Sequence, residues 1–506
     1  MTTTERKALW FEDRQPIDSE ADEFIPGSAY DAVIVGAGLT GLTTALMLAR
    51  AGLSVAVLEA RFAGAVATGN TTAKLSLLHS SALSEIRAHT SVSVAQAYME
   101  GNRQGQAWLL DYLSERGVAV QRRDAFTYAA TPDGVSSLDT EFEACTDAGL
   151  DVTRVMETEL PFEIYGAIKL ADQAQFNPLD VVAALAKDVR SLGGVIIEQA
   201  RVQSVDAGEP VSVVTRRGTV YATRVILATG IPMLDRGLYF AKLTAMRSYA
   251  LAFRVPTETG TAPAIPQGMY LSIDTPSRSV RSAPVAGENR LLVGGNGHVV
   301  GRDSNTMDNV RDIERWTAEH FPGAIRTHSW SAQDYRSANR IPFVGWMPRS
   351  HHRVFIATGY NKWGMTNSVA AALSLTAEIL SDSLPWAETL HHRVTRPRSM
   401  ASGIAAGAEV GGAFTSGWTQ AELTKLPDTA PEEGTGVVGQ QGLKPTAVST
   451  VDGVTCAVSA ICTHMGGIVT WNSAERSWDC PLHGSRFDAD GRLLEGPATD
   501  DLDQIE

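Results

Sequence analysis

Cysteine is scarce in this chain, which has four cysteines among 506 residues. So few thiols exclude the disulfide framework that stabilises small secreted domains. Their distribution is uneven, because Cys145 stands alone whereas Cys456, Cys462 and Cys480 fall within the final 51 residues. We interpret Cys145 as structural and Cys456 as a buried strand residue. The other two belong to a local pattern described below.

Long apolar runs and an excess of basic residues are also missing. No stretch approaches the roughly 20 apolar residues that a membrane-spanning helix needs. Residues 1–29 lack the apolar core of a signal peptide. The net charge of −14 and the dispersed Lys and Arg residues disfavour nucleic acid as a partner. We therefore expect a cytoplasmic protein of two or three domains, with no membrane span and no nucleic-acid partner.

A strand, a helix and a second strand follow the N-terminal arm. Asp31–Val35 is a short, mostly apolar run typical of a strand, and Leu42–Ala51 is a helical stretch. Val55–Leu58 supplies the second strand, and a glycine-rich turn joins the first strand to the helix. This order predicts a parallel βαβ unit.

The glycines of that turn have the spacing of a dinucleotide fingerprint. Gly36 allows the turn, Gly38 lets the backbone approach a pyrophosphate, and Gly41 lets the helix pack close to the strand. The phosphates would face the N–H groups at the start of the helix. Glu59 ends the next strand, where a carboxylate can bind ribose hydroxyls. This pattern predicts a bound dinucleotide, but it does not separate FAD from NAD.

Three later motifs favour FAD over NAD through a family resemblance. They are Ala67-Thr-Gly-Asn-Thr-Thr-Ala73, Val225-Ile-Leu-Ala-Thr-Gly230 and Ala357-Thr-Gly-Tyr-Asn-Lys-Trp-Gly-Met-Thr366. With the fingerprint, they make residues 30–385 resemble the FAD-dependent oxidoreductases of the D-amino-acid oxidase, sarcosine oxidase and glycine oxidase group. The resemblance implies an α/β Rossmann-like FAD-binding domain with an inserted α+β substrate domain.

The same resemblance implies where FAD lies. The first motif follows the pyrophosphate and flavin, and the last places backbone N–H groups against the pyrimidine edge of the flavin. The implied cofactor contacts are Gly36, Gly38, Gly41, Glu59, Thr68, Gly69, Thr71, Thr72, Val202, Ala228, Thr229, Gly230, Gly359, Trp363, Gly364, Met365 and Thr366.

We expect the FAD to be bound without a covalent link, because no His or Cys stands at an attachment position. Acid precipitation of the protein should therefore release the yellow colour into the supernatant. Flavin absorbance that stays with the precipitate would contradict this expectation.

A second glycine pair occurs at Gly295-Asn-Gly297. It follows an apolar run at Leu291–Val293, but His298–Asn309 gives no amphipathic helix. We interpret the pair as a β-turn and expect no second nucleotide domain. Electrons should then come from an organic substrate or a protein partner and not from bound NAD(P)H.

The late cysteines belong to a metal-ligand pattern. Cys462-Thr-His464 is separated by fifteen residues from Cys480-Pro-Leu-His483, so two loops each offer one thiolate and one imidazole. A zinc site could use the same four ligands. A Rieske [2Fe–2S] centre would place both cysteines on one iron and both histidines on the other.

The surrounding residues favour the cluster, because residues 426–506 resemble Rieske domains. The matching segments are Met465-Gly-Gly467, Ser477-Trp-Asp479, Gly484-Ser-Arg-Phe-Asp488 and Gly496-Pro-Ala498. The resemblance implies a small all-β domain that holds a [2Fe–2S] cluster through Cys462, His464, Cys480 and His483.

This domain departs from the high-potential respiratory pattern. That pattern has an extra cysteine in each loop, joined as a disulfide, where this chain has Gly467 and Leu482. Ser485 is retained and could bond a cluster sulfide, whereas Phe487 replaces a tyrosine. Fewer hydrogen bonds to the sulfurs lower the potential. We therefore predict a low to intermediate potential for a Rieske cluster.

The composition changes between the two regions. Pro, Gly, Ala, Ser and Glu accumulate from Arg396 to Gly434 and periodicity disappears, which is typical of a linker. The predicted organisation is an arm (1–29), an oxidoreductase region (30–385), a linker (386–425) and the Rieske domain (426–506). Within the second region, FAD binding is expected over about 30–95, 165–235 and 340–385, and the substrate domain over about 96–164 and 236–339.

The whole arrangement resembles bacterial FAD-dependent oxidoreductases with a C-terminal Rieske domain. This implies an enzyme that oxidises a small amine or amino acid and passes electrons from flavin to cluster to an external acceptor. Tethering keeps the two centres at high effective concentration. Two alternatives stay open: a flavoprotein fed by the cluster, acting as a reductase or monooxygenase, and an electron-transfer component for a partner enzyme.

Catalytic candidates are polar residues close to the flavin motifs. For each of them, scaffold packing is an alternative interpretation. The candidates are Lys74, His79, Tyr335 and Lys362. An Arg clamp for a substrate carboxylate could come from Arg247, Arg281, Arg336 or Arg340.

Overall fold

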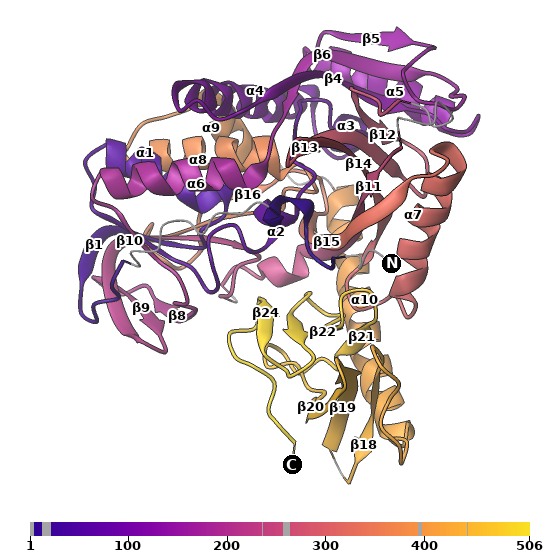
Figure 1. The fold of residues 1–506 in the computed structure, drawn as a ribbon. Helices are drawn as coiled ribbons and strands as arrows, with labels where there is room; N and C mark the ends of the chain where they lie inside the picture. Colours follow the sequence, from indigo (N-terminus) through magenta and orange to yellow (C-terminus); the bar gives the residue numbers. More distant parts are fainter. Residues whose placement is uncertain are drawn as a thin grey trace.

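The computed structural model describes residues 5–12, 22–234, 236–256, 264–392, 397–442 and 444–505, with the backbone alone for 397–409. Figure 1 shows a large body, coloured indigo to orange, and a small body formed by the C-terminal part of the chain in gold and yellow. Every helix in the described part of the chain is too short or too polar to span a bilayer.

The first sheet carries the glycine-rich turn, and its central strands are parallel. In spatial order they are β17 (Val354–Thr358), β10 (Gly218–Gly230), β1 (Ala29–Val35), β2 (Val55–Leu58) and β7 (Val195–Ile197). Consecutive buried apolar residues in these strands suit a sheet that is covered on both faces. Antiparallel strands extend it: β16 (Phe343–Trp346), β8 (Val202–Asp206) and β9 (Val211–Thr215).

Helices cover one face of this sheet and build the larger part of the core. The predicted helix at 42–51 begins earlier, at Leu39, because Gly38 is its N-cap. The helices that contact the sheet are α1 (Leu39–Arg50), α6 (Pro178–Ser191) and α8 (Gly364–Ile379). Helix α4 (Val92–Glu115) packs on α8, and α9 (Pro385–His391) packs on α4. The short η1 (Leu9–Phe11) and α2 (Ala67–Asn70) lie beside them.

A second, mostly antiparallel sheet lies beside the first. Its main path contains β15 (Ile325–Ser337), β11 (Leu243–Arg254), β14 (Glu288–Val299), β13 (Arg278–Val285), β12 (Met269–Ser272), β4 (Gln121–Tyr128), β6 (Ala167–Gln175) and β3 (Lys74–Leu75), with β5 (Val152–Val155) paired to β6. Its helices are α3 (Ala82–His89), α5 (Gly134–Asp147), α7 (Thr306–His320) and the short η2 (Tyr239–Ala241).

Two segments of this sheet differ from the sequence expectations. Strand β6 was expected in the FAD-binding part, but it pairs with β4 in the second sheet. Gly295-Asn-Gly297 was expected to form a turn, but it continues β14, which pairs with both β11 and β13. A Cβ on Gly295 would lie 2.5 Å from the Ser277 carbonyl oxygen, so close strand packing accounts for a glycine there.

The small body is the all-β unit that the sequence predicts after residue 425. One sheet contains β18 (Gly436–Gln441), β19 (Lys444–Val451) and β20 (Val454–Ser459), and the other contains β21 (Thr470–Asn472), β22 (Ser477–Asp479), β23 (Arg486–Asp488) and β24 (Leu493–Glu495). Cys456 lies in β20 and is partly exposed, whereas Cys145 is buried in α5.

The predicted linker is largely helical. After α9, the helix α10 (Pro397–Leu423) occupies most of the segment that was expected to be loose. Val410, Ala413, Trp418 and Ala421 pack against the core of the small body, and Trp418 Nε1 donates to the Gly466 carbonyl at 2.9 Å. Glycines in this stretch lower its intrinsic helix propensity, so packing against the small body stabilises the helix.

Candidate functional site

The glycine-rich turn leaves no room for side chains at two of its positions. Gly36 has a φ of 107°, a region that favours glycine. A Cβ on Gly36 would lie 2.6 Å from the Ala228 carbonyl oxygen, and one on Gly41 would lie 1.9 Å from the Gly36 carbonyl oxygen. The turn therefore requires glycine, and it presents backbone N–H groups at the start of α1 where phosphates bind.

Two side chains hold this turn in place. The Glu59 carboxylate accepts hydrogen bonds from the Ala37 and Arg61 backbone N–H groups, both at 2.8 Å. Thr68 Oγ1 accepts from the Leu39 N–H at 3.0 Å. Burial raises the pKa of Glu59, and the two N–H groups oppose that shift. Glu59 and Thr68 therefore support the glycine-rich turn, and their contacts with FAD stay predictions.

A cavity of about 690 Å³ extends from this turn to the second sheet. The residues around it fit an extended dinucleotide, because the crowded turn, the β10 end and the start of α8 all border one space. The predicted cofactor residues that line it are Gly36, Gly38, Glu59, Thr68, Thr71, Thr72, Val202, Ala228, Thr229, Gly230, Gly359, Trp363, Gly364 and Met365. Gly41, Gly69 and Thr366 lie outside the lining and support it.

Lys74 lies in this cavity, on the edge strand β3. Its Nζ donates to the Tyr270 carbonyl at 2.9 Å and to Ser279 Oγ. Burial and repulsion from Arg281 lower the pKa of Lys74 to about 7. A lysine with that pKa carries a substantial neutral fraction near neutral pH, so it can accept a proton there.

His79 is engaged with the protein on both sides of its ring. Its Nδ1 lies 2.9 Å from Tyr98 Oη, and its Nε2 lies 2.8 Å from the Ser76 carbonyl. The imidazole stacks on Trp363 with ring centroids 4.5 Å apart, and burial lowers the pKa of His79 to about 3. This environment suits a neutral ring that supports the flavin-edge loop more than it suits a proton acceptor.

Tyr335 points toward the small body. Gln333 Nε2 donates to Tyr335 Oη and to the Gly484 carbonyl, both at 2.8 Å. Gly484 directly follows the cluster ligand His483. Burial raises the pKa of Tyr335, so its phenol stays protonated. Gln333, which the sequence did not single out, therefore connects the cavity wall to the cluster loop.

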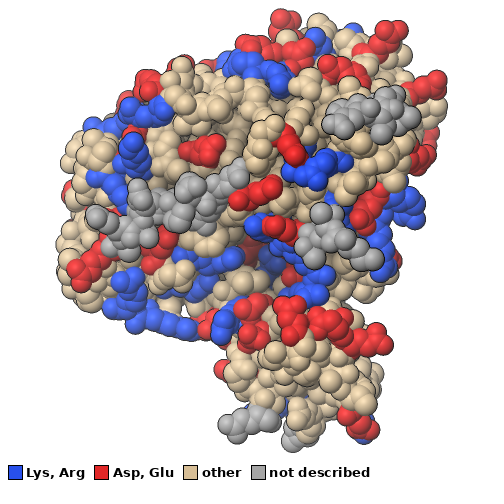
Figure 2. All heavy atoms as spheres, in the orientation of Figure 1, with Lys and Arg blue, Asp and Glu red and all other residues tan. Residues whose placement is uncertain are grey.

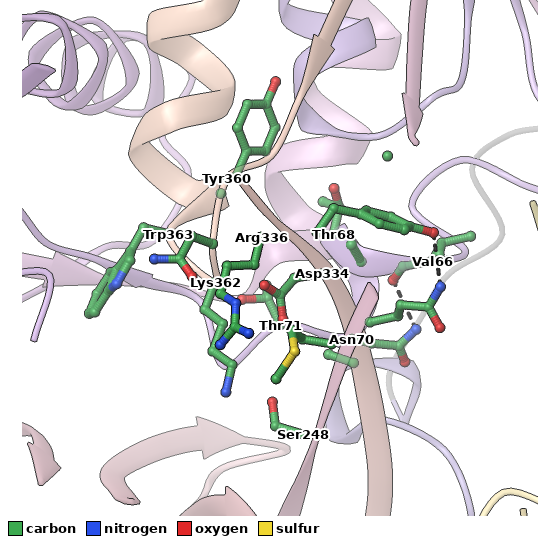
Figure 3. A pocket seen from close by; sticks show the side chains of 18 of the residues that line it. Val66, Thr68, Asn70, Thr71, Ser248, Asp334, Arg336, Tyr360, Lys362 and Trp363 are labelled. Atoms are coloured by element: carbon green, nitrogen blue, oxygen red, sulfur yellow. Dashed lines mark hydrogen bonds between the residues drawn. The ribbon is translucent and has the colours of Figure 1, made fainter. Parts of the chain in front are cut away.

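A group of charged side chains enters the cavity from β15 and the loop before α8. Figure 3 shows Asp334, Arg336 and Lys362 lying close together above Ser248. Asp334 Oδ2 is buried without a hydrogen-bond partner among the described residues. Burial raises the pKa of Asp334, and the positive charges of Lys362, Arg336 and Arg340 oppose that shift. The group offers both signs of charge to a bound molecule.

The four arginine candidates separate into three locations. Arg336 and Arg340 line the cavity, and Arg340 also pairs with Glu85. Arg281 is buried and donates to the Thr72 and Ala73 carbonyls, so it supports the flavin stretch from behind. Arg247 lies at the junction with the small body, outside the cavity lining, where it has the contacts of a structural arginine and not of a substrate clamp.

The four predicted cluster ligands come together on two neighbouring loops. Cys462 and Cys480 are both buried, and their thiols interact, which lowers the pKa of Cys462 and raises the pKa of Cys480. The rings of His464 and His483 have centroids 5.1 Å apart. His483 Nδ1 is buried without a hydrogen-bond partner among the described residues, as expected of a nitrogen reserved for a metal. These donors fit the cluster.

The arrangement of the four ligands also distinguishes between the two kinds of metal site that the sequence left open, a zinc site and a Rieske cluster. A mononuclear zinc site would need four converging ligands. A binuclear cluster instead divides its ligands into a sulfur pair and a nitrogen pair, which is the division seen here.

The cluster loops predict a modest reduction potential. A Cβ on Gly467 would lie 2.5 Å from Leu482 Cδ1, so the two positions that carry the respiratory disulfide are in contact without one. Phe487 is fully buried and offers no hydrogen-bond donor. Redox titration should give a midpoint in the lower or middle part of the Rieske range of about −150 to +300 mV. A midpoint near the top of that range would contradict the prediction.

A buried ionic network joins the small body to the second sheet. Arg247, on β11, lies 3.4 Å from Glu495 and 3.7 Å from Asp479, and its side chain has no exposed surface. Arg486 bonds the same two carboxylates at 3.3 Å. Figure 2 shows Lys and Arg side chains of the large body facing Asp and Glu side chains on the upper rim of the small body.

The cluster loops face the large body. The Phe240 ring lies edge-on to His483 and His464, with centroid distances of 5.1 and 6.5 Å. Gly301, at the end of β14, packs against the backbone of Pro481. The histidine side of the cluster site is therefore covered by the flavin-binding body.

Comparison with known proteins assigns the chain to a family. Residues 31–378 match the family described as FAD dependent oxidoreductase, and residues 424–506 match the Rieske [2Fe-2S] domain. The chain belongs to the FAD dependent oxidoreductases and carries a Rieske domain. A Bacillus subtilis (strain 168) protein described as a Rieske 2Fe-2S iron-sulfur protein, YhfW, is 32% identical over 487 residues, which cover 94% of this chain and 93% of that protein.

Solved structures of this family share the fold of the large body. Glycine oxidase from Geobacillus kaustophilus superposes with a TM-score of 0.60 at 19% identity, covering 71% of this chain and 96% of that one. L-proline dehydrogenase from P. horikoshii gives a TM-score of 0.59 at 16% identity, with the same coverage of both chains. The two family matches, and not these structures, confirm FAD and a [2Fe–2S] cluster as the cofactors of this oxidoreductase.

Some residues around the cavity had no signal in the sequence. Gln333, Arg201 and Ser248 belong to no recognised motif. The segment Leu494–Thr499 contains the Rieske-like Gly496-Pro-Ala498, yet it lines the cavity of the large body. These contacts join positions far apart in the chain, so local pattern could not reveal them.

Proposed function

We propose that this oxidoreductase oxidises a small amine or amino-acid-like substrate and passes the electrons through the Rieske cluster to an external acceptor. The observation that carries the proposal is the pairing of opposite charges in one cavity, with Asp334 beside Arg336 and Lys362. A zwitterion presents a carboxylate and an ammonium group, and these match the two signs of charge. The two similar structures are named a glycine oxidase and an L-proline dehydrogenase, and these names fit an amino-acid substrate.

In the proposed reaction the protein residues orient the substrate and manage its protons. Arg336 and Lys362 hold the carboxylate, and Asp334 faces the ammonium group. The neutral amine of Lys74 accepts the proton that the ammonium group must lose before its C–H bond can be oxidised. When bound, FAD accepts a hydride and the cluster carries single electrons.

The junction supports electron transfer between the two centres. Gln333 bonds both the cavity residue Tyr335 and the cluster-loop residue Gly484. Phe240 packs against both cluster histidines. Tethering and docking together hold the acceptor close to the donor, which favours intramolecular transfer over release of electrons elsewhere.

Anaerobic mixing with a panel of amines and amino acids tests this function. The expected result is bleaching of the flavin absorbance, followed by the EPR signal of the reduced cluster. If no small molecule bleaches the flavin and only a ferredoxin or a reductase reduces the protein, the cluster-fed flavoprotein or the electron-transfer component replaces the proposal.

The proposed role of Lys74 predicts a pH dependence. Its lowered pKa of about 7 means that the amine is charged below pH 7 and neutral above it. The rate of flavin reduction should therefore rise with pH through about 7 and level off above it. In Lys74→Met the rise should disappear and the plateau should fall about 100-fold.

Stopped-flow absorbance across pH 5.5 to 9 measures both effects, with Lys169→Met as the control. Lys169 pairs with Asp124 at the surface of β6, and its side chain is 33% exposed. The control should keep the wild-type profile. An unchanged pH profile in Lys74→Met would remove Lys74 from the proposed mechanism.

A further inference from the structure

The Rieske domain contributes one wall of the flavin cavity. The segment Leu494–Thr499, here called the wall segment, lines the same cavity as the nucleotide turn at Gly36 and the ribose-side carboxylate Glu59. Within it, Glu495 is 8% exposed and Ala498 is 4% exposed. The cavity is therefore incomplete without the C-terminal domain.

The large body holds the wall segment at both ends. Arg201 Nη2 donates to the Leu493 carbonyl at 2.9 Å, and Gln203 Nε2 donates to Asp500 at 2.9 Å. Arg201 and Gln203 flank Val202, the predicted adenine contact, and Arg201 attracts the nearby Glu59 carboxylate. The contacts that anchor the segment thus belong to the nucleotide end of the cavity.

The cluster loops hold the same segment from the other side. The Ala498 N–H donates to Ser485 Oγ at 3.0 Å, and Arg486 pairs with Glu495 at 3.3 Å. Ser485 lies two residues after the ligand His483. The wall segment is therefore bonded to the nucleotide site and to the cluster loop at once.

We propose that the wall segment contacts bound FAD, so that FAD binding and docking of the Rieske domain stabilise each other. If docking completes the cavity, undocking weakens FAD binding, and by thermodynamic reciprocity loss of FAD weakens docking by the same factor. The inference concerns bound FAD and requires no particular substrate, so its outcome is independent of the proposed amine oxidation.

Hydrogen exchange with and without FAD tests whether loss of FAD weakens docking of the Rieske domain in the full-length wild-type protein. After FAD removal, the peptide that contains residues 494–499 should exchange at least about fivefold faster. The peptide that covers β19 and β20 lies away from the junction and should be unchanged. Equal exchange of the wall segment in both forms would overturn the proposal.

A glycine substitution tests whether undocking of the Rieske domain weakens FAD binding. A Cβ on Gly301 would lie 2.7 Å from the Pro481 nitrogen, so Gly301→Val should push the Rieske domain off without entering the cavity lining. Gly287→Val is the control, because Gly287 has a similar φ of 77°, against 69° for Gly301, but open space around it. Titration of deflavinated protein with FAD should show at least about tenfold weaker binding in Gly301→Val than in the control.

The exchange measurement also shows whether the Rieske domain has undocked in the Gly301→Val variant. Faster exchange of the wall segment together with weaker FAD binding supports the coupling. Faster exchange with FAD affinity equal to that of Gly287→Val would show that docking and FAD binding are independent, which would overturn the proposal. The cluster EPR signal, recorded in parallel, confirms that the variant domain is folded.

Discussion

Replacing Arg247 by methionine is expected to loosen the junction between the flavin-binding body and the Rieske domain, and to slow electron transfer from flavin to cluster at least about 100-fold. Arg247 is fully buried between Asp479 and Glu495. Its loss leaves two buried carboxylates with Arg486 as their remaining shared partner. Removing one partner of a buried ion pair costs about 3–5 kcal/mol, which is two orders of magnitude or more in a docking equilibrium.

Two measurements check this result. Denaturant unfolding, followed separately by flavin and cluster absorbance, should change from one shared transition to two. Rapid mixing should show that flavin reduction and cluster reduction separate in time. The control is Arg254→Met, because Arg254 lies on the same strand but pairs with Glu288 at the surface, where its side chain is 49% exposed. Identical behaviour of the two variants would mean that Arg247 does not hold the domains together.

The second large effect is expected from Gly41→Ala, which should reduce FAD binding at least about 100-fold while the cluster remains. The added methyl carbon would lie 1.9 Å from the Gly36 carbonyl oxygen, a separation that forces the turn and α1 apart. The phosphate-binding N–H groups lose their geometry when that happens. A disturbance of this kind is local to the first sheet, so the four cluster ligands are not touched.

The ratio of flavin to iron in purified protein measures this effect directly. Gly52→Ala serves as the control, because Gly52 follows the same helix and its Cβ would meet no atom within 4 Å. Its φ of 87° makes alanine unfavourable by about 1 kcal/mol, a backbone penalty that the helical Gly41 does not have, so a larger loss of FAD in Gly41→Ala comes from the collision. Normal FAD content in Gly41→Ala would contradict the role of close packing at this turn.

Local features were predicted well because they are set by short-range physics. The strand–turn–helix from β1 to α1 and the pattern of cluster ligands each rest on residues within about twenty positions of one another, and the assignment to FAD rests on several motifs that are each about ten residues long or shorter. The α10 helix was missed for the opposite reason. Its glycines argue against a helix locally, and the Rieske core that stabilises it lies later in the chain.

The arginine and tyrosine candidates show more clearly that local sequence does not reveal distant partners. Arg247 looked like a possible substrate clamp, but Glu495, its ion-pair partner, lies 248 residues away. Tyr335 was a catalytic candidate, and the structure adds that its hydroxyl bonds Gln333, which in turn bonds Gly484, 151 residues further along the chain. No composition or periodicity around either residue carries information about such partners.

The sequence by itself determined which cofactors this protein binds and which residues belong to each motif. Those motifs depend on backbone conformations that only glycine adopts easily and on ligands that must lie within one or two neighbouring loops. Only the tertiary structure decided that the two cofactor sites share a wall, and that a buried ionic network joins the domains. Burial and the pairing of distant charges arise when the chain is packed, because they depend on which surfaces meet and not on which residues are adjacent.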